Sequence, residues 1–202
     1  MSTPRRHHDP ERAEARRCQV LDAAAGCFRE HGFHGASMAE ISKRAGMSAG
    51  HIYNYFASKE EIIFGIVDRN VEDVLERMQT LVDGGRDVLD VLVDRAAEGV
   101  AHNTEPAYVS LMLEVSAEAA RNPAVAAKVR AADRILLGRL HELLMSSGKA
   151  TAYREDPARQ GRLNMLVAMF EGIRQRALAC PDLDLDSLVA PMRNVIRAVL
   201  TG

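Results

Sequence analysis

The chain has 202 residues, 47% of them apolar, with no Trp and a formal net charge of −2. This length can bury a large core. No apolar run approaches the 18 or so residues of a membrane-spanning helix, so a membrane protein is not expected. The three cysteines have no metal-ligand spacing, which excludes a zinc cluster and favours reduced thiols in the cytoplasm. No apolar stretch typical of a secretion signal follows the first Met.

Charge and composition divide the chain. Residues 1–60 carry nine basic and seven acidic side chains, whereas residues 61–202 carry 17 basic and 21 acidic ones. Good helix formers dominate and long alternating β-branched runs are absent, which predicts an all-α fold. A slightly basic head on an acidic body has the sign expected of a nucleic-acid binder.

Taken in chain order, the first ten residues are polar and predict a disordered arm, residues 1–10. Beyond it, apolar residues at helical spacing predict about nine helices. They cover residues 11–31, 37–46, 48–56, 59–82, 86–102, 105–121, 123–147, 157–179 and 186–200. The expected organisation is a three-helix head, residues 11–60, and a long fourth helix that leads into a helical body, residues 61–202.

The second and third helices have the pattern of a helix-turn-helix. Ser37 and Glu40 form a capping-box pair, and Gly46 is positioned to end the second helix. Ser48 caps the third helix, in which Ile52 and Phe56 form the buried i, i+4 pair. A short helix with a polar outer face, braced by the helix before it, fits the major groove of DNA.

The stretch from Ala23 to Ile63, AAAGCFREHGFHGASMAEISKRAGMSAGHIYNYFASKEEII, resembles the DNA-binding segment of the TetR family of transcriptional regulators. Met47 stands where the family usually has Val, and Ile52 where it has Leu. The resemblance implies a dimeric repressor that binds a palindromic operator in double-stranded DNA and is released by a small molecule.

Carried onto matching positions, the resemblance also implies a set of DNA-contacting residues. They are Ser37, Ser48, Ala49, Gly50, His51, Tyr53, Asn54 and Lys59. Of these, Ser37, Tyr53 and Lys59 are expected at phosphates, and His51 and Asn54 at bases. The alternatives are ordinary ones, since both serines act as helix caps in any case, and Tyr53 or Lys59 can be a half-buried or surface side chain.

For the body, the resemblance implies a homodimer through helices 157–179 and 186–200, whose apolar surface alternatively completes the monomer core. The candidates for binding a lipophilic or aromatic effector are His102, Tyr108, Met112, Glu114, Met165, Met169 and Phe170. Methionines and aromatics at helical spacing are alternatively core residues. Glu114, an acidic residue within the apolar run 109–115, either anchors an effector or pairs with an arginine such as Arg174.

An enzyme is not expected, because the sequence has no glycine-rich phosphate loop, no metal-ligand cluster and no nucleophile–base spacing. No catalytic residue, metal ligand or cofactor is therefore predicted. Two other functions remain open: a helical interaction protein that does not bind DNA, and a TetR-like activator that does not work by ligand-released repression.

Overall fold

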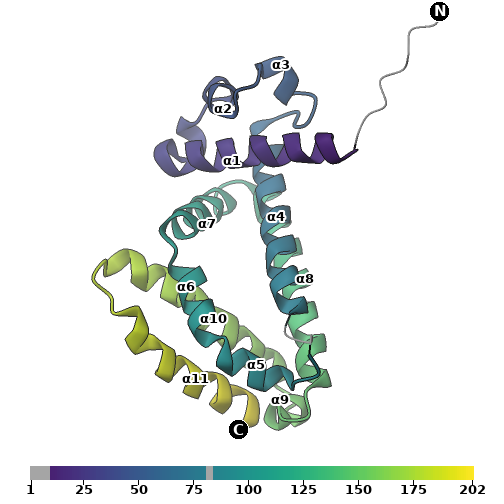
Figure 1. Ribbon diagram of the computed structural model, residues 1–202, viewed down its shortest axis with the longest axis vertical. Coiled ribbons are helices and arrows are strands. Elements are labelled where there is room, and N and C mark those ends of the chain that lie inside the picture. Colours follow the sequence, from purple (N-terminus) through teal and green to yellow (C-terminus); the bar gives the residue numbers. More distant parts are fainter. Residues whose placement is uncertain (1–9, 81–83) are drawn as a thin grey trace, which may run out of the picture. The chain divides into compact units, whose positions relative to one another are not determined.

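Helix α1 (Pro10–Gly35) opens the part of the chain that the computed structural model describes, residues 10–80 and 84–202 (Figure 1). Its buried face carries Val20, Ala24 and Phe28, spaced one helical turn apart. Gly32 has φ 71° and ψ 167°, so helical geometry breaks there. The first helix, predicted to end at residue 31, continues to Gly35 beyond this break. Glycine adopts the positive φ of the break without steric cost. Apart from Pro10, the expected N-terminal arm lies outside the described residues.

Helix α2 (Met38–Ala45) is held at both ends as the sequence predicts. Ser37 Oγ accepts a hydrogen bond from the Glu40 N–H at 3.2 Å, and the Glu40 carboxylate accepts one from the Ser37 N–H at 2.8 Å. Gly46 ends the helix in the left-handed conformation, with φ 62°. This reciprocal capping fixes where the helix-turn-helix begins.

Helix α3 (Ala49–Ile52) is shorter than predicted, so the expectation of a helix through Phe56 is wrong in its extent. The N–H groups of Asn54 and Tyr55 bond to the carbonyls of His51 and Ile52, three residues back, which tightens the chain into turns. The segment still buries Ile52 and Phe56 as expected.

Helix α4 (Lys59–Gln79) follows Ser58, whose Oγ accepts the Glu61 N–H at 3.2 Å, as expected of its N-cap. Residues 81 and 82 of the predicted fourth helix lie outside the described residues. The chain forms two units: residues 1–68 with 114–128, and residues 69–113 with 129–202. The residues of the expected body, 61–202, are thus shared between both units.

The remaining helices begin after residue 83. They are α5 (Val88–Asp94), α6 (Ala96–Thr104), α7 (Pro106–Ala119), α8 (Pro123–Ser146), α9 (Thr151–Glu155), α10 (Arg159–Ala179) and α11 (Leu185–Thr201). The one helix predicted over 86–102 is two, divided at Arg95, and α9 was not predicted. The all-α class is confirmed, with eleven helices and no strand among the described residues.

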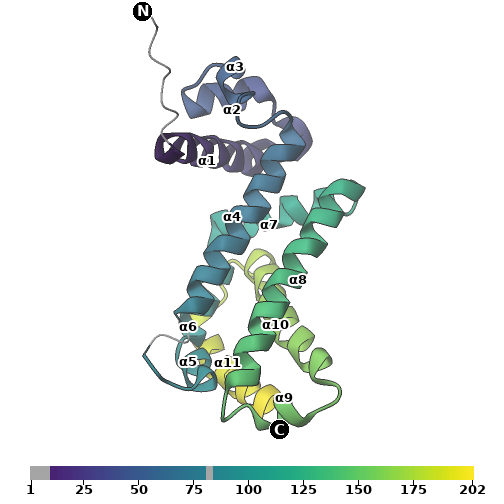
Figure 2. The same ribbon diagram turned by 90° about the vertical axis from the view of Figure 1, so that its right-hand side faces the viewer.

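The core of the second unit lies among α5, α6, α8, α9, α10 and α11. Helices α6, α10 and α11 pack side by side (Figure 1), and the C-terminal end of α11 lies against α9 (Figure 2). Tyr153 of α9 is fully buried, and its hydroxyl lies 2.7 Å from His141 Nδ1, so the buried phenol has a hydrogen-bond partner.

Candidate DNA-binding face

The second helix, which precedes the turn and α3, is held firmly on the first helix. Ile41 and Ala45 bury the inner face of α2, and Gln19 of α1 donates an amide hydrogen bond to the Ala45 carbonyl at 2.7 Å. That carbonyl belongs to the last turn of α2, where no partner exists within the helix. The position of α2 on α1 is thereby fixed by packing and by one directed bond.

An exposed polar face follows the turn. Ser48 Oγ caps α3 by accepting the His51 N–H at 3.3 Å. Buried Ile52 and Phe56 anchor the segment from within. Among the residues predicted to contact DNA, all but Lys59 are exposed: Ser37, Ser48, Ala49, Gly50, His51, Tyr53 and Asn54. Their exposure is a condition for base and phosphate contact.

Tyr55, three residues after Ile52, orients one of these side chains. The imidazole of His51 stacks on the Tyr55 ring with centroids 5.5 Å apart and an interplanar angle of 20°, and His51 Nε2 lies 3.3 Å from the Tyr55 hydroxyl. Arg17 of α1 donates to the Tyr55 carbonyl at 3.4 Å and lies 4.6 Å above the Phe56 ring. The direction of the His51 ring is thus set by contacts that reach back to α1.

Lys59 has partners that sequence reasoning did not foresee. Its Nζ donates to the carbonyls of Phe33 at 2.5 Å and Ala36 at 2.9 Å, and it lies 4.5 Å above the Phe33 ring. These bonds use two of the three ammonium hydrogens. Lys59 therefore ties the start of α4 to the segment that enters α2, and one hydrogen remains for any phosphate.

The C-terminal part of α7 belongs to the same unit as this head. Glu114 Oε2 accepts the Phe33 N–H at 3.2 Å, beside the break at Gly32. Glu118, 2% exposed, lies with Oε2 2.9 Å from His34 Nε2. Glu114 was expected to line an effector site or to pair with Arg174; its partner is instead the backbone of the head.

The other candidate effector residues lie in the second unit, and the structure brings only some of them together. The rings of His102 and Tyr108 have centroids 4.2 Å apart. Met169 and Phe170 are partly buried against the core, whereas Met165 is 67% exposed. Arg77 contacts His102 and Arg174 contacts Tyr108, and neither arginine was a predicted effector contact. The sequence suggested Arg174 only as a partner of Glu114 and gave no signal for Arg77.

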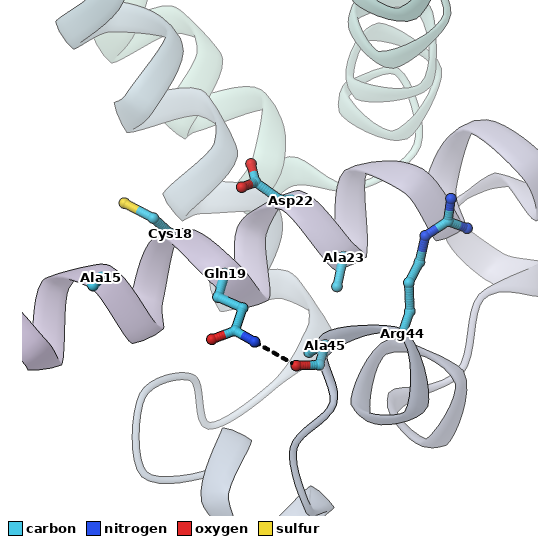
Figure 3. Close-up of a pocket in the computed structure, with 7 residues that line it drawn as sticks. All are labelled: Ala15, Cys18, Gln19, Asp22, Ala23, Arg44 and Ala45. Atoms are coloured by element: carbon cyan, nitrogen blue, oxygen red, sulfur yellow. Dashed lines mark hydrogen bonds between the residues drawn. The ribbon is translucent and has the colours of Figure 1, made fainter.

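An open hollow of about 580 Å³ lies on the head between α1 and α2 (Figure 3). Its walls are Ala15, Cys18, Gln19, Asp22, Ala23, Arg44 and Ala45. None of these residues was expected to bind an effector. Arg44 is engaged with Glu30 at 2.7 Å and Gln19 with the Ala45 carbonyl, so two of its polar side chains serve the helix packing.

None of the described helices combines the length and the apolar character of a membrane span. No group of three or more His, Cys, Asp or Glu side chains within residues 10–80 and 84–202 has the arrangement of a metal site.

The fold and the exposed face define the class: an all-helical protein with a capped helix-turn-helix near its N-terminus. Residues 20–66 match the family model described as bacterial regulatory proteins, tetR family. The segment that holds the helix-turn-helix is thus similar to the corresponding segment of this family.

Individual relatives agree with this similarity. The chain is 36% identical over 120 residues to the HTH-type transcriptional regulator UidR of Escherichia coli K12, a match that spans 58% of this chain and 59% of that relative. Among solved structures it resembles Salmonella enterica GusR, with 26% identity, coverage of 93% and 96%, and a TM-score of 0.74. The fold also matches FadR of Bacillus subtilis, solved with stearoyl-CoA, at 20% identity, coverage of 92% and 98%, and a TM-score of 0.74.

Proposed function

We propose that this chain is a ligand-responsive transcriptional regulator, a homodimer that binds a palindromic operator and is released by a small molecule. The observation that carries DNA binding is the exposed face of Ser48, His51 and Asn54 on a segment anchored by buried Ile52 and Phe56. A polar face on a rigid, capped support is what major-groove reading requires.

Within that face we assign two roles. Ser37, Tyr53 and Lys59 hold phosphates, which fixes the register of the protein on the duplex, and His51 and Asn54 read base edges. Ala49 and Gly50 keep the start of α3 small, so the backbone can approach the groove closely. A Cβ at Gly50 would meet nothing within 4 Å, so its smallness is not required by packing within the chain.

The dimer would form through α10 and α11. Within residues 10–80 and 84–202, seven large apolar side chains are exposed, and four of them lie on these two helices: Met165, Leu178, Leu185 and Val195. On α10, Gly161, Met165, Ala168 and Gly172 follow one another at one-turn intervals and all are exposed. Small residues along one helix face allow a second helix to approach closely, and a stable interface buries about 800 Å² on each partner.

Release requires that the effector bind the non-DNA-binding state more tightly than the DNA-binding one. Two structural neighbours were solved with small molecules, FadR with stearoyl-CoA and SmeT with triclosan. We assign the effector to the second unit, near His102, Tyr108 and Phe170. A regulator of this kind works in the cytoplasm, where its operator is.

The deciding experiment is selection of random DNA fragments by the purified chain, followed by sequencing. Enrichment of a palindrome with half-sites about one helical turn apart is expected, with affinity that falls steeply as salt is raised. A folded protein that enriches no sequence at low salt would exclude this function and favour the helical interaction protein. A palindrome at which the chain raises transcription would favour the activator.

A further inference from the structure

A cluster of two arginines and two aromatic rings belongs to the second unit. It joins the end of α4, the end of α6, the start of α7 and the last third of α10. Arg77 Nη2 lies 3.2 Å from His102 Nε2, the rings of His102 and Tyr108 have centroids 4.2 Å apart, and Arg174 Nη1 donates to the Tyr108 hydroxyl at 3.4 Å. The four side chains thus form one continuous set of contacts.

The directions of these hydrogen bonds leave two donor groups of the cluster without an acceptor among the described residues. A guanidinium has no acceptor, so His102 Nε2 accepts from Arg77 and the imidazole is neutral, with its hydrogen on Nδ1. Burial and the charges of Arg77 and Arg174 lower the pKa of His102, in keeping with a neutral ring. Tyr108 accepts from Arg174, so its own hydroxyl hydrogen points elsewhere. Among the described residues, neither that hydrogen nor His102 Nδ1–H meets an acceptor.

The carboxylates near the cluster do not match these donors. Glu105 accepts the N–H groups of Ala107 and Tyr108 and so caps α7. Glu171 forms an ion pair with Arg174, with 3.2 Å between Glu171 Oε1 and Arg174 Nη2. The Glu171 side chain is 60% exposed, whereas the Arg174 side chain is 19% exposed. Asp73 acts on His102 only through its charge. An anion that enters the cluster can therefore replace the exposed Glu171 as the partner of Arg174.

An apolar wall adjoins the cluster along the packing of α6 on α10. Phe170 lies one turn before Arg174 on α10, and its ring contacts Gly99, one turn before His102 on α6. A Cβ at Gly99 would lie 2.8 Å from Phe170 Cε1, so glycine is what allows the ring to lie there. Met169 and Phe170 pack against the apolar core of this unit.

We infer that the effector is an organic acid with an apolar body, its carboxylate held by Arg174 and Tyr108 and its apolar part beside Phe170. That this ligand controls DNA binding rests on the proposed function, whereas its chemical class rests on the cluster. A guanidinium fork with an adjacent hydroxyl donor matches the two oxygens of a carboxylate. Neutral His102 supplies a further donor without requiring a proton from solvent.

The test compares acids with their uncharged amides, using the full chain without DNA. The probes are 4-phenylbutyrate and decanoate, each beside its amide, with affinity measured by calorimetry and by the shift in melting temperature. The acids are expected to bind at least about tenfold more tightly than the amides. Arg174→Gln should abolish that preference, and Tyr108→Phe should reduce it while keeping the ring.

Arg176→Gln is the matched control, since Arg176 lies two residues further along α10 and contacts Cys180 instead. It should bind both acids as the native chain does. If Arg174→Gln does not fold, Arg174→Lys replaces it and should weaken acid binding, because an ammonium lacks the guanidinium fork. Equal affinity for acid and amide, unchanged acid binding by the Arg174 and Tyr108 variants, or no acid binding at millimolar concentration would each overturn the inference.

The two proposals can fail separately. A palindrome selected by a chain that binds no acid would refute only the effector class. Acid binding that depends on Arg174, in a chain that selects no DNA, would refute the regulator and leave an acid-binding protein. Without ligand, Arg174→Gln should keep its DNA affinity, because Arg174 is outside the head.

Discussion

His34 Nε2 lies 2.9 Å from Glu118 Oε2, an oxygen fully shielded from solvent. The distance is that of an ion pair, although the angles do not make a hydrogen bond, and the His34 side chain is 70% exposed. The buried carboxylate of α7 therefore depends on a histidine at the end of α1. Glu114, one turn earlier on α7, accepts the Phe33 N–H, so two carboxylates meet the same short segment.

Replacing His34 tests this dependence. His34→Ala leaves the Glu118 carboxylate buried without its partner and should lower the free energy of unfolding by about 1 kcal/mol, a value kept small because His34 is exposed. Urea denaturation measures it. His31→Ala is the control, since His31 and Glu30 form an exposed pair at 3.9 Å, and it should change little. Adding Glu118→Met to His34→Ala should restore stability; equal midpoints for the native chain and His34→Ala would contradict the argument.

The proposed DNA-binding face, which includes His51, Tyr53 and Asn54, predicts two kinds of DNA-binding defect. His51→Ala and Asn54→Ala should change which operator sequences are preferred, by about 1–3 kcal/mol at the base pairs they contact. Tyr53→Phe should weaken all sequences equally, because it removes the hydroxyl that we propose binds a phosphate. Binding to a panel of single-base operator variants measures both effects. A uniform loss from the His51 and Asn54 variants would remove them as base readers.

The proposed dimer interface predicts that a substitution on α10 will lower the molecular mass in solution from that of a dimer to that of a monomer. Gly172→Arg puts a long charged side chain on the exposed face of α10, where a Cβ meets nothing within 4 Å, so the monomer fold should tolerate it. Light scattering should then give the mass of a monomer, with much weaker operator binding. Gly138→Arg on α8 is the control, because that glycine is also exposed and open. A dimeric Gly172→Arg variant would exclude this face as the interface.

Asp87 predicts a pH-dependent contribution to stability. Burial opposes ionisation, but hydrogen bonds from Ser147 and from the N–H groups of Leu89, Gly148 and Lys149 outweigh it and lower the pKa of Asp87. A carboxyl whose pKa is lowered by folding stabilises the fold above its unfolded value, about 3.9, and loses this effect as pH falls through the folded value.

Asp87→Asn should therefore cost about 1–3 kcal/mol at neutral pH. The difference from the native chain should shrink as the pH falls below about 4, where the native carboxyl also becomes protonated. Thermal melts across this pH range measure it. Asp90→Asn, which removes only a surface pair with Lys149, should cost about 0–1 kcal/mol. A constant difference at every pH would mean that the ionised form is not the stabilising one.

What the sequence could predict was mostly local. The capping pair Ser37 and Glu40 and the stop at Gly46 are three to nine residues apart, so their geometry follows from helix rules alone. The early end of α3 was missed because no sequence pattern distinguishes a turn with i to i−4 backbone hydrogen bonds from one with i to i−3 bonds. Helix α9 was missed because five residues are too few to show a periodicity.

Long-range partners were beyond reach for a different reason. Phe33 and Glu114 are 81 residues apart, and nothing near either residue indicates the other. Glu114 was noticed as an unusual acidic residue in an apolar run, yet its partner is a backbone N–H, which any residue offers. His102 and Tyr108 were candidates as amphipathic residues. Two arginines give the cluster its charge. Arg174 was considered only as a partner of Glu114, and Arg77 looks like an ordinary surface arginine in the sequence.

The peptide groups around Phe33 are held from both ends, by Lys59 at the carbonyl and by Glu114 at the N–H. The unit that carries the helix-turn-helix is consequently assembled from two separate stretches of chain, residues 1–68 and 114–128. During synthesis the head cannot reach its final form until residue 128 has left the ribosome. A fragment cut after α4 would contain every residue of the proposed DNA-binding face and would still lack part of its own support.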